Sequence, residues 1–105
     1  MLAALAAAAL SVTNVGVGVR EWRISSYVPE VRRGTVAFNV HNYGEDGHDL
    51  RVRGPRRFRS AVLPEVPAGG NGRLVVKLPR KGRYVLVCTL PGHEAQGMRA
   101  IVRVT

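Results

Sequence analysis

The stretch that best predicts the fold reads GRYVLVCTLPGHEAQGMRAIVRV and covers residues 82–104. Apolar residues alternate with polar ones at both of its ends, which is typical of strands that bury one face. Between these two strands lies a loop of glycine, proline and small residues. The loop returns His93 and Met98 to the end of the domain where Cys88 lies.

The same alternation recurs upstream of this stretch. Apolar residues take every second position in residues 35–41 and 73–78, as in strands with one solvated face. Near Arg20 and Glu21 the apolar positions change from odd to even, which predicts a bulge or a change of sheet. Turns rich in glycine and proline separate the segments, and residues 54–72 form the one long irregular stretch. About seven to eight short antiparallel strands are expected, which favours an all-β, two-sheet sandwich.

The composition is that of a folded chain of one domain. The chain has 105 residues, of which 46% are apolar and 22% are charged, close to the globular average. We assign residues 14–105 to one domain and residues 1–13 to a short apolar N-terminal segment. The single cysteine, Cys88, excludes an internal disulfide, a multi-cysteine zinc site and a cysteine-ligated iron–sulfur cluster.

The N-terminal segment has two interpretations. Its apolar run, Leu2–Leu10, is shorter than the roughly 18 to 20 residues that cross a bilayer. Its length suits the hydrophobic part of a secretory signal, although no basic residues precede it. A frayed alanine-rich helix left from a linker fits equally well, so both interpretations stay open.

The candidate ligands are two histidines, one cysteine and one methionine. His48 falls in register with the apolar face of its strand, so it points inward, and so does Cys88. Each alone is explained as a core residue. Cys88, His93 and Met98 converge at one end of the sandwich, and a thiolate, an imidazole and a thioether suit copper. With His48 the set becomes two histidines and a cysteine, with Met98 as a distant axial ligand.

At this point the sequence resembles the cupredoxins, the small blue-copper proteins. The resemblance rests on NYGEDGHDL, residues 42–50, and on the stretch of residues 82–104 quoted above. It implies a Greek-key β-sandwich or barrel with one type 1 copper ion at one end. By this resemblance His48, Cys88 and His93 hold the copper, and Met98 is the weak axial ligand.

The resemblance also implies outer-sphere transfer of single electrons between redox partner proteins, outside the cytoplasm in the periplasm or cell envelope. His93 is then the exit for the electron, and an apolar ring around it docks the partner; the ring consists of Leu90, Pro91, Ala95 and Met98. An enzyme is not expected, because four engaged ligands leave no open position for substrate. The alternative is a copper carrier or buffer without electron-transfer duty.

Two departures from the family pattern have consequences. Asp49 follows the first ligand histidine, where family members often have asparagine. We expect Asp49 to accept hydrogen bonds from Thr89 and its charge to lower the reduction potential. Gly92 takes the place of the second cysteine of the related binuclear copper domain, so a mononuclear site is expected.

The chain is strongly basic, with a formal net charge of +9. The run Arg51–Arg59 is either a solvated strand edge or a surface that steers an acidic redox partner or associates with an anionic membrane. Nucleic-acid binding is not expected, because Trp22, Phe38 and Tyr84 fall on apolar faces and are assigned to the core. The protein is expected to act as a monomer.

Overall fold

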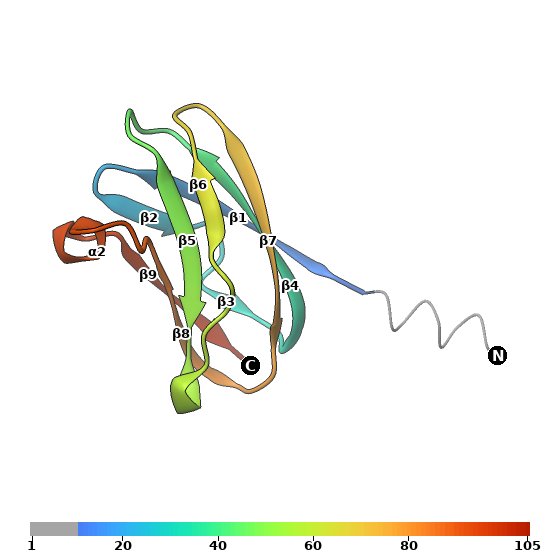
Figure 1. The fold of residues 1–105 in the computed structure, drawn as a ribbon. Coiled ribbons are helices and arrows are strands. Elements are labelled where there is room, and N and C mark those ends of the chain that lie inside the picture. Colours follow the sequence, from blue (N-terminus) through green and yellow to red (C-terminus); the bar gives the residue numbers. More distant parts are fainter. Residues whose placement is uncertain (1–10) are drawn as a thin grey trace.

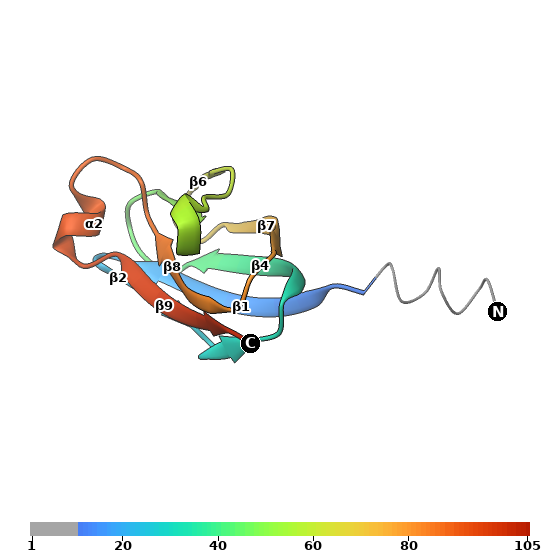
Figure 2. The same ribbon diagram turned by 90° about the horizontal axis from the view of Figure 1, so that it is seen from below.

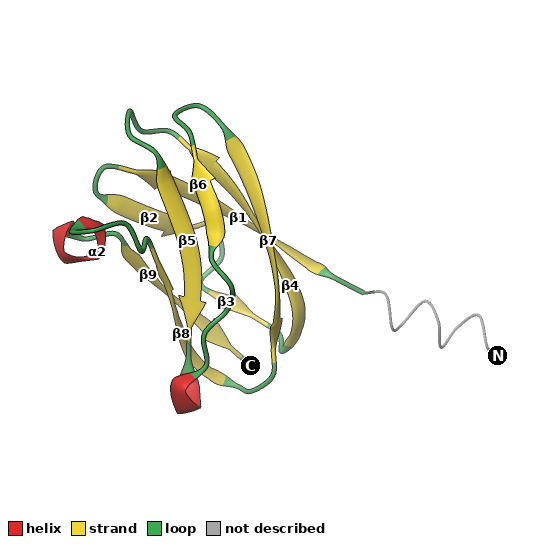
Figure 3. Ribbon diagram, viewed as in Figure 1, coloured by secondary structure: helices red, strands yellow, loops and turns green. Residues whose placement is uncertain are grey.

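Two β-sheets packed face to face make up residues 11–105, the part of the chain that this computed structural model describes (Figure 1). One sheet has the strand order β2 (Arg23–Ser26), β1 (Thr13–Arg20), β4 (Gly34–Asn42) and β7 (Asn71–Leu78); the other has β3 (Glu30–Val31), β9 (Arg99–Val104), β8 (Gly82–Val87), β5 (His48–Arg53) and β6 (Leu63–Val66). The helical elements here are two short turns, η1 (Pro55–Arg57) and α2 (His93–Gln96) (Figure 3).

This architecture confirms the all-β sandwich. Strands adjacent in a sheet are often distant in sequence, as in the antiparallel pair β4 and β7, and this is expected of a Greek-key arrangement. The expectation of antiparallel strands was wrong for two pairs, because β1 pairs with β4 and β3 pairs with β9 in parallel. The sheets stay separate and do not close into a barrel. The described residues contain nine strands, more than expected, because the short strands β2 and β3 are separate elements. The interpretations of the apolar run at residues 2–10 lie outside the described residues.

The core lies between the sheets and is filled by every second residue of the longer strands. Along β7 the buried residues Leu74, Val76 and Leu78 alternate with exposed ones. Phe38 from β4 and Tyr84 from β8 are the largest fully buried side chains. The period-2 pattern therefore placed these strands and their inward faces correctly.

The change of parity near Glu21 has a different cause from the one expected. β1 and β2 form an antiparallel hairpin in which Val19 faces Ile24 and Arg20 faces Arg23. Residues opposite each other in a hairpin point to the same side of the sheet, so an odd position matches an even one. The prediction of a bulge or a change of sheet was wrong, because the chain reverses within one sheet.

A register irregularity occurs instead between β5 and β6. His48 faces Val66 and Leu50 faces Leu63, so β6 has one residue more than β5 over this interval, as in a β-bulge. The stretch of residues 54–72, which was expected to be irregular, contains η1, β6 and the start of β7.

Within residues 11–105 no helix is long and apolar enough to cross a bilayer.

One end of the sandwich collects segments from both sheets. The turn between β1 and β2 lies there beside α2, away from the start of β1 (Figures 1 and 2). β5 begins at this end with His48, and the chain from the end of β8 to the start of β9 passes over it. We call this end, formed by Glu21–Trp22, His48 and residues 88–98, the α2 pole.

Candidate metal centre

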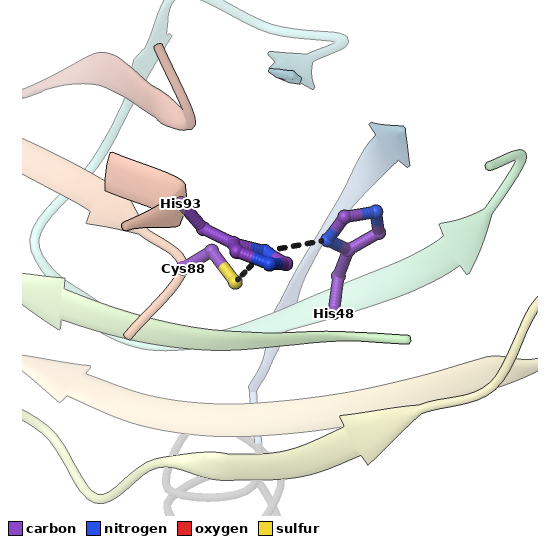
Figure 4. Close-up of side chains that lie close together, drawn as sticks. All are labelled: His48, Cys88 and His93. Atoms are coloured by element: carbon purple, nitrogen blue, oxygen red, sulfur yellow. Dashed lines mark hydrogen bonds between the residues drawn. The ribbon is translucent and has the colours of Figure 1, made fainter. Parts of the chain in front are cut away.

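Three ligand-type side chains meet at the α2 pole. Nδ1 of His48 lies 3.2 Å from Nδ1 of His93, and Sγ of Cys88 lies 3.5 Å from the same His93 atom. All three donor atoms lie within 4.8 Å of one another. Figure 4 shows the two imidazole rings and the thiol turned toward one another. The structure thus brings together His48, Cys88 and His93, which the sequence had placed at one end of the sandwich.

The spacing of these atoms suits a single metal ion. Metal–nitrogen bonds of about 2.0 Å and metal–sulfur bonds of about 2.3 Å hold two ligands of one ion roughly 3.3 to 3.8 Å apart. The separations around His93 Nδ1, 3.2 and 3.5 Å, lie at or just below this range. Two imidazole nitrogens and a thiolate are also a donor set that first-row ions such as copper favour. The donor atoms of the set as a whole lie within 4.8 Å of one another. The residues present therefore fit a bound ion after a small movement of side chains, without rearrangement of the fold.

His48 is held from its far side by a carboxylate. The side chain is fully buried at the start of β5, and its Nε2 lies 3.1 Å from Oε1 of Glu21. The Glu21 carboxylate also accepts hydrogen bonds from the backbone N–H groups of Glu45 at 3.1 Å and Asp46 at 2.6 Å. Backbone hydrogen bonds to the carboxylate, that of Asp46 foremost, lower the pKa of Glu21 to about 2. Glu21 is therefore ionised at neutral pH.

Cys88 lies at the end of β8, the strand next to β5 in the same sheet. It follows the last residue of β8, is fully buried, and donates its backbone N–H to the carbonyl of Met98 at 3.2 Å. Burial raises the pKa of the Cys88 thiol above its ordinary value of 9.0. A metal ion that binds here must therefore displace the thiol proton.

Asp49 links the strand that carries His48 to the loop that carries His93. Its two carboxylate oxygens accept hydrogen bonds from the backbone N–H of Thr89 at 2.6 Å and from the Thr89 hydroxyl at 2.5 Å. The expected hydrogen bonds between Asp49 and Thr89 are thus confirmed. They fix the residue after Cys88 directly to the residue after His48.

Met98 is fully buried beneath the loop rather than part of a surface ring. Its backbone N–H donates to the carbonyl of His93 at 3.1 Å, and its own carbonyl accepts from Cys88. The expectation that Met98 lines the docking ring was wrong, because its side chain is fully buried. The exposed apolar residues of the loop are Pro91 and Ala95, with Leu90 partly buried.

Trp22 is the residue of the site that the sequence misassigned. It is 39% exposed, and its ring meets that of His93 edge to face with centroids 4.8 Å apart. The assignment to the core was wrong because Trp22 belongs to the turn after β1, where strand parity no longer applies. At Gly97, with φ of 126°, a Cβ would lie 3.0 Å from the carbonyl oxygen of Trp22. A glycine there lets the loop and the turn approach closely.

Glu21 was not singled out by the sequence as part of the site. Its position next to the parity change was the available signal, because a hairpin turn there ends at the same pole as the start of β5. A glutamate in a turn is nevertheless an ordinary solvated residue in most chains. Only the three-dimensional arrangement shows its contact with His48.

No protein-family model matches the sequence, and no curated protein matches it significantly. Solved structures do resemble it. An auracyanin from Roseiflexus castenholzii is 20% identical with a TM-score of 0.66, covering 90% of this chain and 96% of the auracyanin. Auracyanin A, a blue copper protein from Chloroflexus aurantiacus, is 17% identical with a TM-score of 0.70, covering 90% and 100%. Rusticyanin from Thiobacillus ferrooxidans is 20% identical with a TM-score of 0.64, covering 90% and 77%.

These structures define the fold of the chain as that of the cupredoxins. Larger copper enzymes resemble it too. A multicopper oxidase is 9% identical with a TM-score of 0.62, and the match covers 91% of this chain but 44% of the oxidase. The small auracyanins, which are covered over nearly their whole length, are therefore the better comparison for a chain of this size.

Proposed function

We propose that this protein is a mononuclear type 1 copper protein that carries single electrons between redox partners. In this proposal His48 and His93 would hold one copper ion through Nδ1, Cys88 would hold it through Sγ, and Met98 would be a weak fourth ligand. The observation that carries the proposal is a buried cysteine sulfur beside two imidazole Nδ1 atoms, within 4.8 Å of one another. The cupredoxin fold of the chain supports it.

The bound ion would supply the redox chemistry by cycling between Cu(I) and Cu(II). The residues of the chain keep the ligand geometry constant during this cycle. His48 is fixed by Glu21, Cys88 by the backbone of Met98, and the loop by Asp49. A site that changes little between oxidation states needs little reorganisation for each transfer, which favours fast electron exchange.

The alternative functions are less well supported. A copper carrier must release its ion readily, whereas His48, Cys88 and Met98 are all fully buried. An enzyme needs an open position on the metal for its substrate, and the proposed ligand set leaves none. We therefore favour electron transfer over copper transport or catalysis.

Voltammetry of the copper-loaded protein tests this proposal. An electron carrier gives a reversible one-electron wave and keeps its copper through repeated cycles in the presence of a Cu(I) chelator. Loss of copper to the chelator on the first reduction would favour the carrier. A catalytic current with dioxygen would favour an enzyme.

We further propose that the partner is an acidic redox protein that docks at the α2 pole beside His93. A groove of about 360 Å³ runs along the outer side of residues 87–92, and Arg51, Arg53 and Arg59 line it. The acidic residue in its lining, Glu94, is paired with Arg53. The groove therefore has excess positive charge next to the exposed part of the loop, and a carboxylate-rich surface complements it.

Charge reversal in and outside the groove tests the docking site. Arg59→Glu is compared with Arg73→Glu on β7, because both residues are exposed and both variants lose the same charge. With ferricyanide as an anionic oxidant of the reduced protein, Arg59→Glu should slow the reaction about tenfold and Arg73→Glu much less. Equal slowing would contradict a local site, and binding to phosphatidylglycerol vesicles that depends on Arg59 would assign the groove to a membrane.

We also place this function outside the cytoplasm, as the resemblance to cupredoxins implies. The apolar run Leu2–Leu10 has the length of a secretory signal's hydrophobic part. Fractionation of cells that express the full chain tests this placement. Recovery of the protein in the cytoplasmic fraction would contradict it.

A further inference from the structure

The carboxylate of Glu21 joins three segments of the α2 pole. It extends from the turn between β1 and β2, contacts Nε2 of His48, and accepts the backbone N–H groups of Glu45 and Asp46. Gly44 leaves room for it, because a Cβ at this position would collide with both carboxylate oxygens. The side chain is 23% exposed, so the contact is largely shielded from water. We call this arrangement the Glu21 clamp.

The clamp determines which nitrogen of His48 has the proton. Both carboxylate oxygens of Glu21 accept backbone N–H groups, so this carboxylate acts as an acceptor, and its 3.1 Å contact with His48 places a proton on Nε2. In the neutral imidazole the proton on Nε2 leaves Nδ1 with a free lone pair. Nδ1 is the atom that faces His93 and Cys88 (Figure 4). Glu21, in the turn after β1, thus keeps Nδ1 of His48 free to bind a metal ion in the metal-free protein.

The negative charge of the clamp would also act on a copper ion held at the site. A carboxylate that accepts the second N–H of a ligand histidine increases the basicity of that ligand. A more basic imidazole stabilises Cu(II) more than Cu(I), because the ion of higher charge gains more from electron donation. The backbone donors of Glu45 and Asp46 hold the carboxylate in place, so it cannot rotate freely into solvent.

We propose that Glu21 is a positioning residue that holds His48 in the metal-binding tautomer and shifts the copper site toward Cu(II). This inference rests on the proposed copper function. It differs from the role expected of Asp49, because Asp49 contacts Thr89 on the cysteine side of the site, whereas Glu21 contacts a ligand directly.

Glu21→Gln tests the charge of the clamp, and Glu45→Gln is its matched control. Glutamine keeps the shape of glutamate, and both variants remove one negative charge from the same pole, but the Glu45 side chain is exposed and does not contact His48. We expect Glu21→Gln to lower the Cu(II) affinity about 10- to 100-fold and the Cu(I) affinity less. A tenfold larger loss for Cu(II) raises the midpoint potential by about 59 mV. Equal potentials in the two variants would overturn the proposal.

Nitrogen-15 NMR of the metal-free protein tests the tautomer separately from copper binding. In the wild type the neutral His48 ring should have its proton on Nε2 and a bare Nδ1. In Glu21→Ala the two tautomers should mix, while backbone amide signals of the sheets stay in place. A His48 tautomer that is the same in both proteins would overturn the proposal even if copper binds.

The two tests also separate this inference from the proposed function. If the wild type binds no copper, the proposed function fails, but the tautomer of His48 still reports on the clamp. If the wild type binds copper and Glu21→Gln behaves like Glu45→Gln, the function stands and the inference fails.

Discussion

The two histidines of the site occupy contrasting surroundings at the α2 pole. His48, on β5, is fully buried and held at Nε2 by Glu21. His93 lies on the single turn of α2, is only partly buried, and meets the exposed ring of Trp22. We call these the strand half and the loop half of the site. In the proposed function, the buried strand half would fix the geometry, and the more exposed loop half would provide the route for electrons to a partner.

The largest expected effect comes from removing each imidazole. His48→Gly and His93→Gly should both abolish the visible absorption of the copper-loaded protein, since each removes one of three strong ligands. Added imidazole should restore the absorption of His93→Gly, because the space opens toward solvent beside Trp22. It should not restore that of His48→Gly, whose position is enclosed by the core. Titration with imidazole at fixed Cu(II) measures both outcomes.

If added imidazole restored the absorption of both variants equally, the contrast between the two halves would be wrong. It would mean that the strand half is as accessible as the loop half. Rescue of neither variant would mean that the loop half is not open to small molecules.

A stability comparison sharpens the same contrast. Leu50 lies two residues after His48 and is fully buried, whereas Leu90 is a partly buried residue of the loop. Leu50→Ala should destabilise the metal-free protein by about 2 to 5 kcal/mol, and Leu90→Ala by about 1 kcal/mol or less. Urea unfolding followed by tryptophan fluorescence measures both. Similar losses would show that the loop is as much a part of the core as β5.

Asp49 connects the two halves, so its replacement should have an intermediate effect. Asp49→Asn removes a charge near Cys88 and weakens the hydrogen bonds to the backbone and hydroxyl of Thr89. The midpoint potential should rise, with a tenfold shift in the ratio of Cu(II) to Cu(I) affinity corresponding to about 59 mV. Thr89→Ser keeps both donors and serves as the control. An unchanged potential in Asp49→Asn would contradict the role of this carboxylate.

The smallest expected effect concerns acid stability of the metal-free protein. Folding lowers the pKa of Glu21 from 4.5 to about 2, chiefly through the backbone hydrogen bond from Asp46. A carboxyl group with a lowered pKa stabilises the folded state above its unfolded pKa and loses this effect as the pH falls toward 2. The wild type should therefore be more stable than Glu21→Gln at pH 6, and the difference should disappear by about pH 2. A difference that does not change with pH would contradict this.

Much of the fold followed from local patterns in the sequence. β7 buries alternate residues, and Val36, Phe38 and Val40 of β4 do the same although Ala37 is buried as well, so the period of two is visible in the sequence. His48 and Cys88 each lie an even number of positions from the buried apolar residues of their own strands. Their inward positions were therefore predictable from the sequence. The meeting of Cys88 with His93 followed from the short loop between two strands.

The parts that could not be predicted depend on turns and on contacts between distant segments. The reversal at Glu21 and Trp22 looks like a bulge in the sequence, because both features change the parity of apolar positions. Trp22 was assigned to the core for the same reason, although it covers His93. The contact of Glu21 with His48 spans 27 residues and needs the two sheets to be placed first. The docking role expected of Met98 failed because its side chain is fully buried, in register with Val102 and Val104 of β9.

The most direct test of the account is titration of the metal-free protein with Cu(II), followed by visible absorption. We predict an intense charge-transfer band that saturates at one copper ion per chain, that is absent in Cys88→Ser, and that survives in Met98→Leu with a raised potential. A wild type without this band, or a band of equal strength in Cys88→Ser, would contradict the claim that His48, Cys88 and His93 share one copper ion.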